Sequence, residues 1–149
     1  MRAPRSEQEL FYLYGLLSAR YEMPIQVLEY DTHEGVDAIA QIRNTSLISP
    51  KNVHGRIEFK YEVSANYAID HFFEAIDAVI CWRVDRTGPI YEESSSGDTI
   101  GHLRPRRTPL LNPPIDTHEI AYDSGKGKRI IPVLQIAELF APKVGKKRK

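Results

Sequence analysis

The 149-residue sequence contains one cysteine, Cys81, and no long apolar run. A single thiol excludes a disulfide framework and a thiolate metal cluster within the chain. No apolar stretch approaches the roughly 20 residues that a membrane-spanning helix needs. The N-terminus leads directly into an amphipathic pattern and lacks the apolar segment of a signal peptide. These absences predict a cytoplasmic protein with no membrane partner.

The sequence also lacks net charge, because 20 Lys and Arg residues balance 20 Asp and Glu residues. A neutral total argues against a protein that coats nucleic acid nonspecifically, but two local basic clusters remain. Three arginines lie within residues 104–107, and residues 143–149 form a basic tail that we expect to be disordered. Each cluster has two interpretations, a solvated segment or a phosphate-binding one. The tail residues expected to contact DNA are Lys146, Lys147 and Arg148.

Apolar periodicity predicts one α/β domain over residues 1–142, with a mixed β-sheet flanked by helices. The segment 57–63 shows strand periodicity best, because its odd-numbered residues are apolar and its even-numbered residues are charged. Residues 85–128 are rich in Pro, Gly and Ser, which predicts a variable, loop-rich insertion. The predicted helices cover 6–21, 64–76 and 135–140, and the predicted strands cover 25–30, 36–42, 57–63, 78–82 and 129–134, the last an edge strand because of Pro132.

Asp37, Glu58 and Lys60 are the residues whose types and spacing suggest chemistry. Glu58 and Lys60 share one face of the predicted strand, and a neighbouring strand would bring Asp37 to the same place. Two carboxylates provide the hard oxygen ligands that Mg²⁺ or Mn²⁺ prefers. Such an ion polarises a phosphoryl oxygen, and a lysine stabilises the negative charge that develops at phosphorus. The trio therefore predicts phosphodiester hydrolysis, although Glu-x-Lys is also common on solvated strands.

The order of these motifs resembles the PD-(D/E)XK restriction-endonuclease-like superfamily, and more narrowly the nuclease-like segments attached to histidine-kinase-like ATPases. The similarity covers the first helix, Asp37, Glu58-x-Lys60, His71 and the run Asp77–Trp82. It implies an αβββαβ core, with Asp37 and Glu58 as metal ligands and Lys60 as the catalytic lysine. It also implies an acidic residue from the first helix, for which the candidates are Glu9 and, as an alternative, Glu7.

The sequence thus predicts a Mg²⁺- or Mn²⁺-dependent endonuclease that hydrolyses DNA, in a defence or DNA-processing setting. RNA remains open as a substrate. A homodimer would allow both strands to be cut, and an ATPase or another defence protein is a candidate partner. The alternative from a different class is a catalytically inactive endonuclease-like module that binds nucleic acid or a protein. A plain structural domain with a solvated Glu-x-Lys strand is the third interpretation.

Overall fold

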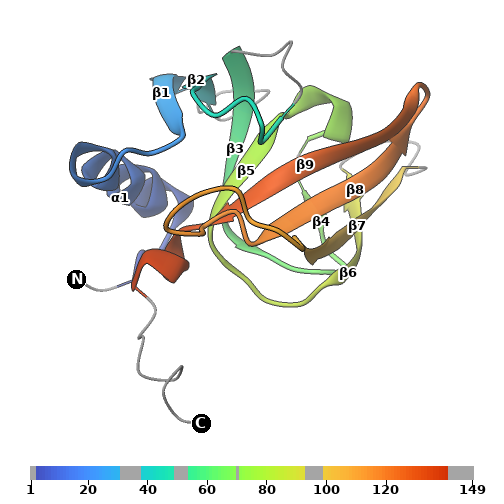
Figure 1. Ribbon diagram of the computed structural model, residues 1–149. Coiled ribbons are helices and arrows are strands. Elements are labelled where there is room, and N and C mark those ends of the chain that lie inside the picture. The colour runs from blue at the N-terminus through green and yellow to red at the C-terminus, as the bar shows by residue number, and fades with distance from the viewer. Residues whose placement is uncertain (1–2, 31–37, 49–53, 70, 93–98, 141–149) are drawn as a thin grey trace, which may run out of the picture.

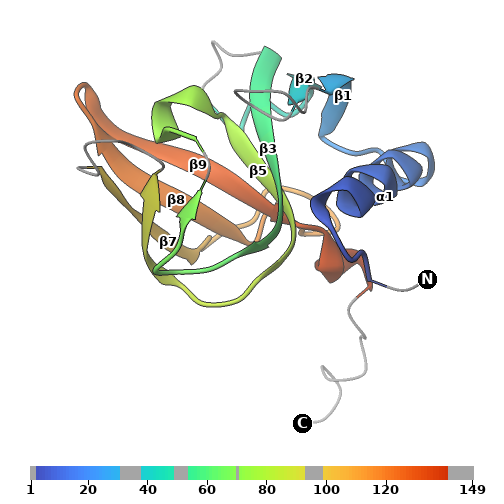
Figure 2. The ribbon, with the colours of Figure 1, turned by 180° about the vertical axis from the view of Figure 1, so that it is seen from behind.

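In the computed structural model, a curled nine-stranded β-sheet makes up most of the molecule, with one α-helix near one end (Figures 1 and 2). The structure describes residues 3–30, 38–48, 54–69, 71–92 and 99–140. Only one α-helix lies within these ranges, so the predicted α/β fold, an αβββαβ sheet flanked by helices, is wrong. The protein is mostly β because segments expected to be helix or loop form strands instead.

Along the chain, strands mostly follow one another directly, with few helical turns between them. The strands are β1 (Ile25–Tyr30), β2 (Ala38–Ile42), β3 (His54–Val63), β4 (Ala68–Ile69), β5 (Ala78–Val84), β6 (Gly88–Glu92), β7 (Ile100–Pro105), β8 (His118–Ser124) and β9 (Gly127–Gln135). The helices are α1 (Glu7–Arg20) and the 3₁₀ helices η1 (Phe73–Ala75) and η2 (Ile136–Phe140). The sheet order is β1-β2-β3-β5-β9-β8-β7-β6-β4, with parallel pairing only for β3–β5, β5–β9 and β4–β6.

The helix α1 begins where the sequence predicts. Ser6 is its N-cap, and the Ser6 hydroxyl accepts a hydrogen bond from the Glu9 backbone N–H at 3.1 Å. The Glu9 carboxylate in turn accepts from the Arg5 backbone N–H at 2.9 Å. The apolar face of the helix packs toward β3, and its buried residues are Leu10, Leu13, Tyr14 and Leu17.

The two faces of the sheet bury two separate hydrophobic clusters. The first lies under α1, where the Phe59 ring meets Phe11 edge-on at a centroid distance of 5.3 Å and Tyr14 at 5.9 Å. The second is enclosed by the curl of the sheet and contains Phe73 from η1 and Val79 from β5. The strand β3 contributes side chains to both clusters, with Ile57 and Phe59 in the first and Val63, farther along the strand, in the second.

Backbone hydrogen bonds continue beyond the paired ends of β3 and β5 and connect the segments that lead to β4 and β6. The Asp85 N–H donates to the Val63 carbonyl at 2.9 Å, and the Ala65 N–H donates to the Arg86 carbonyl at 2.8 Å. The Asn66 N–H then donates to the Pro89 carbonyl at 2.7 Å. The second cluster is therefore surrounded by a half-barrel of strands.

The predicted helix over 64–76 and the predicted loops over 85–128 are both wrong. Asn66 has a φ of 72°, which lies in the left-handed region and interrupts a helix. The residues after it form β4, which pairs in parallel with β6. The strands β6, β7 and β8 all begin within 85–128, so the Gly and Pro residues there mark turns between short strands.

The predicted edge position of the strand containing Pro132 is also wrong. The strand β9 lies between β5 and β8, in the middle of the sheet. Pro132 is in register with Glu119 of β8, whereas the pairing with β5 begins only at Val133. At Pro132, β9 therefore pairs with β8 only. The N–H that proline lacks is not needed for pairing with β5.

The actual edges of the sheet are β1 and β4. The register of β1 shifts between Val27 and Glu29, so a β-bulge interrupts its pairing with β2. The strand β4 has two residues. None of the helices in the described part of the chain has both the length and the hydropathy of a membrane span.

Candidate functional site

The centre of the candidate site is Glu58, a charged residue with no exposed surface. Its neighbours on β3, Ile57 and Phe59, belong to the first hydrophobic cluster, so Glu58 points to the opposite face. Its partner in register on β5 is Val79, which belongs to the second cluster. The sheet therefore carries the Glu58 carboxylate into the interior of the half-barrel.

His71 contacts Glu58 directly. It lies between β4 and η1, and its Nδ1 atom is 3.0 Å from Glu58 Oε1. The side chains of His71 and Glu58 are 16% and 1% exposed, respectively. An ionised carboxylate accepts hydrogen bonds, so with Glu58 ionised the Nδ1 atom is the donor. The position of His71 in the sequence did not indicate that its partner would be Glu58.

Lys60 lies on the same face of β3 as Glu58. Residues two apart on a strand are separated by roughly 6.6 Å along it. Lys60 is partly buried and is in register with Cys81 of β5. Burial, with a smaller effect from Glu62, raises the pKa of the Cys81 thiol, which makes this cysteine a poor nucleophile and metal ligand. The pair Glu58 and Lys60 is thus kept together as predicted, and Cys81 belongs to the core.

Asp37 and the predicted DNA contacts of the tail lie outside the described residues. Asp37 directly precedes Ala38, the first residue of β2, and Ala38 is in register with Ile57 of β3. The strands β2 and β3 are antiparallel neighbours, as the site hypothesis requires. Asp37 as a metal ligand therefore remains a prediction, and so do the DNA contacts of Lys146, Lys147 and Arg148.

The structure does not bring Glu9 or Glu7 to Glu58. Both lie in the first turn of α1, whose buried residues all belong to the first cluster. Glu58 points to the other face of β3, and the Glu9 carboxylate already accepts from the Arg5 backbone. The described arrangement thus places the first-helix acids on the wrong side of the sheet to join Glu58.

The chemistry of the donors fits a divalent ion in part. Glu58 supplies a carboxylate oxygen and His71 an imidazole nitrogen, and both are ligands for ions such as Mn²⁺. Within the described ranges no group of three or more His, Cys, Asp or Glu side chains is placed to hold a metal ion. A complete site therefore needs a further carboxylate, and Asp37 is the one that the sequence nominates.

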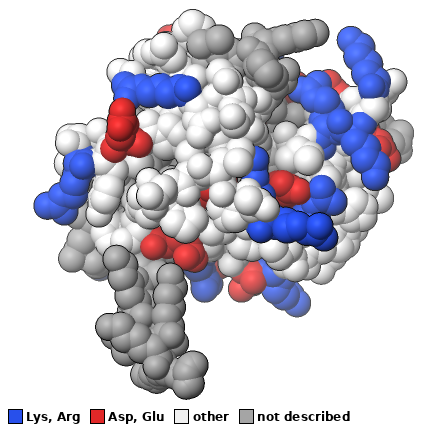
Figure 3. Space-filling model, viewed as in Figure 1, with Lys and Arg blue, Asp and Glu red and all other residues white. Residues whose placement is uncertain are grey.

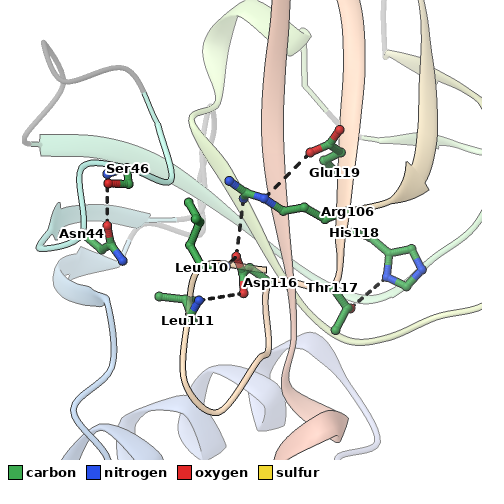
Figure 4. A network of polar contacts seen from close by, with 9 residues as sticks. All are labelled: Asn44, Ser46, Arg106, Leu110, Leu111, Asp116, Thr117, His118 and Glu119. Atoms are coloured by element: carbon green, nitrogen blue, oxygen red, sulfur yellow. Dashed lines mark hydrogen bonds and ion pairs between the residues drawn. The ribbon is translucent and has the colours of Figure 1, made fainter. Parts of the chain in front are cut away.

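Arg106, from the arginine cluster at 104–107, takes part in a separate polar network that is drawn in Figure 4. The fully buried Asp116 carboxylate accepts the Leu110 N–H at 2.7 Å and lies 3.6 Å from Arg106 Nη1. Arg104 Nε donates to Glu119 at 2.8 Å. Two of the three arginines are thus neutralised by acids, which favours the interpretation that this segment is structural.

Comparisons with known proteins identify no relative of this chain. No protein-family model, curated protein or solved structure matches the chain. The resemblance to the PD-(D/E)XK superfamily therefore remains a prediction made from the order of the sequence motifs.

Proposed function

We propose that this protein is a divalent-metal-dependent nuclease that hydrolyses phosphodiester bonds of DNA. The observation that carries the proposal is the fully buried Glu58, hydrogen-bonded to His71 and followed on the same strand face by Lys60. The face of β3 that lines the half-barrel thus carries a carboxylate paired with an imidazole and, two residues on, an ammonium group.

The energetics of burial support a functional role for Glu58. Removing an ionised carboxylate from water costs several kcal/mol even after the surroundings relax. The neighbouring side chains Val79, Cys81 and Val133 belong to the second hydrophobic cluster. Replacing Glu58 and His71 together with apolar residues of similar volume would cost the fold little, whereas removing one partner alone would leave the other uncompensated. A carboxylate at this position is explained better by chemistry than by packing.

Each residue has a distinct role in the proposed reaction. Glu58 and Asp37 would hold a Mg²⁺ or Mn²⁺ ion, which would polarise the scissile phosphate and lower the pKa of a bound water. Lys60 would place its ammonium against the negative charge that develops at phosphorus. His71 would fix the orientation of the Glu58 carboxylate, as an outer partner commonly does for a metal-binding residue.

The motif order is the support for the resemblance to the PD-(D/E)XK superfamily, whereas the αβββαβ core that this resemblance implies is not the observed fold. The strand with Glu58 and Lys60 and the strand of the run 78–82 are parallel neighbours, with Glu58 in register with Val79. The proposal extends to the remaining expectations, a homodimer that cuts both strands and an ATPase or other defence protein as partner. The rival is a catalytically inactive module that binds nucleic acid or a partner protein, and it predicts binding of DNA without metal-dependent cleavage.

A plasmid assay distinguishes the enzyme from the rival. Supercoiled plasmid is incubated with the full chain in Mg²⁺, in Mn²⁺ and in EDTA, and nicked and linear forms are quantified. Metal-dependent nicking that is absent in EDTA supports the nuclease. Binding of the plasmid without nicking in either ion supports the inactive module and overturns the proposed activity.

Replacing Lys60 with Met is expected to slow cleavage by about 100-fold, because the ammonium opposite the developing charge is lost. Met retains most of the length and the apolar stem of Lys, so the packing beside Cys81 should change little. Initial rates on plasmid, with circular dichroism to confirm folding, provide the measurement. A Lys60→Met rate within threefold of the parent would remove Lys60 from the proposed chemistry.

Replacing His71 with Ala is expected to lower the affinity for Mn²⁺ or the cleavage rate by about 10- to 100-fold, the usual effect of losing an outer hydrogen-bond partner. His71→Asn is the matched variant, because its amide N–H can replace the Nδ1 donor to Glu58. Calorimetric titration with Mn²⁺ reports binding separately from catalysis. Equal losses in His71→Ala and His71→Asn would show that the ring itself, and not the hydrogen bond, is required.

A further inference from the structure

The hairpin formed by β8 and β9 ends in a tip that extends beyond the rest of the sheet (Figures 1 and 2). The last residues in register are Ser124 and Gly127. The Ser124 hydroxyl donates to the Gly127 carbonyl at 2.8 Å and accepts from the Lys126 N–H at 3.2 Å. Gly127 has a φ of 123°, a conformation that side-chain-bearing residues rarely adopt. The tip is therefore held in one shape by its own hydrogen bonds.

The tip carries a concentration of unneutralised positive charge. Lys126, Lys128 and Arg129 are all exposed, and Asp123 is the acid among residues 123–130. In the part of the chain that the structure describes, none of these three cations forms an ion pair. Figure 3 shows Lys and Arg side chains gathered at the upper right, where the hairpin of Figure 1 ends. The paired arginines of the 104–107 segment offer less charge to a partner.

The tip lies at a suitable distance from the candidate site. Glu58 is in register with Val79, and Val79 with Val133 of β9, so Glu58 and Val133 are at one level of the sheet. From Val133 to Gly127 the strand β9 runs six residues, or roughly 20 Å at about 3.3 Å per residue. That span corresponds to about six nucleotides of one DNA strand at 3.4 Å each.

An open cavity separates the tip from the segment that carries His71. Its volume is about 400 Å³, and its walls include Arg56, Phe72, Ser124 and Gly125. Acidic side chains, Glu74 among them, also line this cavity, so its floor would repel phosphate. Contact with a polyanion is thus favoured at the exposed tip and not in the cavity beneath it.

We propose that the β8–β9 hairpin is a DNA-binding arm whose Lys126, Lys128 and Arg129 side chains contact the phosphates of duplex DNA. A two-stranded β-ribbon fits the major groove, and phosphate contacts add affinity without selecting a sequence. The arm would hold the duplex along the sheet, about six nucleotides from the level of Glu58. This inference rests on the proposed nuclease function, but it concerns binding and is tested without cleavage.

The test compares two variants of the full chain with equal changes in charge. The hairpin variant carries Lys126→Gln, Lys128→Gln and Arg129→Gln. The control carries Arg5→Gln, Arg20→Gln and Arg43→Gln, three exposed positions before and at the end of α1 and after β2. Both variants leave the turn glycines unchanged, and thermal unfolding confirms that both fold. Fluorescence anisotropy of a labelled 20-base-pair duplex in EDTA, over a salt series, measures binding.

The hairpin variant is expected to bind the duplex at least about 10-fold more weakly at 50 mM salt, with the slope of log affinity against log salt reduced by about 2 to 3. The control should retain the affinity of the parent, and its slope of log affinity against log salt should differ from the parent's by less than about 1. Curves for the hairpin variant that superimpose on the parent's, or equal losses in both variants, would overturn the arm. So would a parent that does not bind duplex DNA, or one that prefers single-stranded RNA or poly-glutamate. Plasmid nicking by the parent is scored separately, so the activity can stand if the arm fails.

Discussion

Replacing Glu58 with Gln is expected to reduce plasmid cleavage by about 1000-fold or more in both Mg²⁺ and Mn²⁺, while leaving the fold intact. The substitution removes the negative charge that would hold the ion and preserves the size and the hydrogen-bonding capacity of the side chain. Losing one charge-stabilising group at a reacting centre commonly costs this much in rate. Initial nicking rates, together with circular dichroism and the midpoint of thermal unfolding, provide the measurement.

Glu62→Gln is the matched control for this experiment. Glu62 is on the same strand as Glu58, but it is partly exposed and pairs with Arg83. Its replacement should change the cleavage rate by less than about threefold, as expected for a surface ion pair of small energy. If Glu58→Gln cuts as fast as the parent while the parent is active, the site lies elsewhere. If both variants lose activity, the effect is not specific to Glu58.

Replacing Asp116 with Ala is expected to destabilise the protein by about 3–5 kcal/mol, because a buried charge pair loses one partner. Asp116 is fully buried, accepts backbone N–H groups from Leu110 and Leu111, and faces Arg106 at 3.6 Å. Arg106 Nη1 is buried without a hydrogen bond, so it would be left with still less compensation for its charge. Urea unfolding followed by circular dichroism measures the loss.

Two further variants separate the charge from the hydrogen bonds of Asp116. Asp116→Asn keeps an oxygen that can accept from the backbone, and it should lose less stability than Asp116→Ala. The double variant Arg106→Leu with Asp116→Ala removes both charges, and it should recover part of the loss. If Asp116→Ala unfolds within about 1 kcal/mol of the parent, the network in Figure 4 does not stabilise the loop between β7 and β8.

The sequence was informative where the partners of a segment are close in the chain. The predicted helix over 6–21 corresponds to α1, and the predicted strand over 25–30 has the bounds of β1. Glu58 and Lys60 are on the same face of β3, as strand periodicity indicated. In these segments the local capping residues and the alternation of apolar side chains agree with the tertiary structure.

The sequence was misleading where partners come from far along the chain. Residues 64–76 show helical spacing of apolar side chains, yet Ile69 and Phe73 are buried by strands that lie later in the sequence. The strands β6 and β7 are short and contain Gly88, Pro89 and Gly101, which read as turns when their sheet partners are unknown. The contact of His71 with Glu58 depends on the same distant packing, so the candidate site could be predicted only in part.

The two edges of the sheet limit how copies of this protein can associate. An uninterrupted edge strand offers a row of free backbone groups to which another chain can add a strand. The bulge in β1 breaks that row, and the two residues of β4 make too short a template. Within the residues that the structure describes, neither edge offers a long template for the strand-by-strand growth that leads to fibrous aggregates. These edges favour a homodimer that forms through side-chain surfaces over one that extends the sheet from one copy into the next.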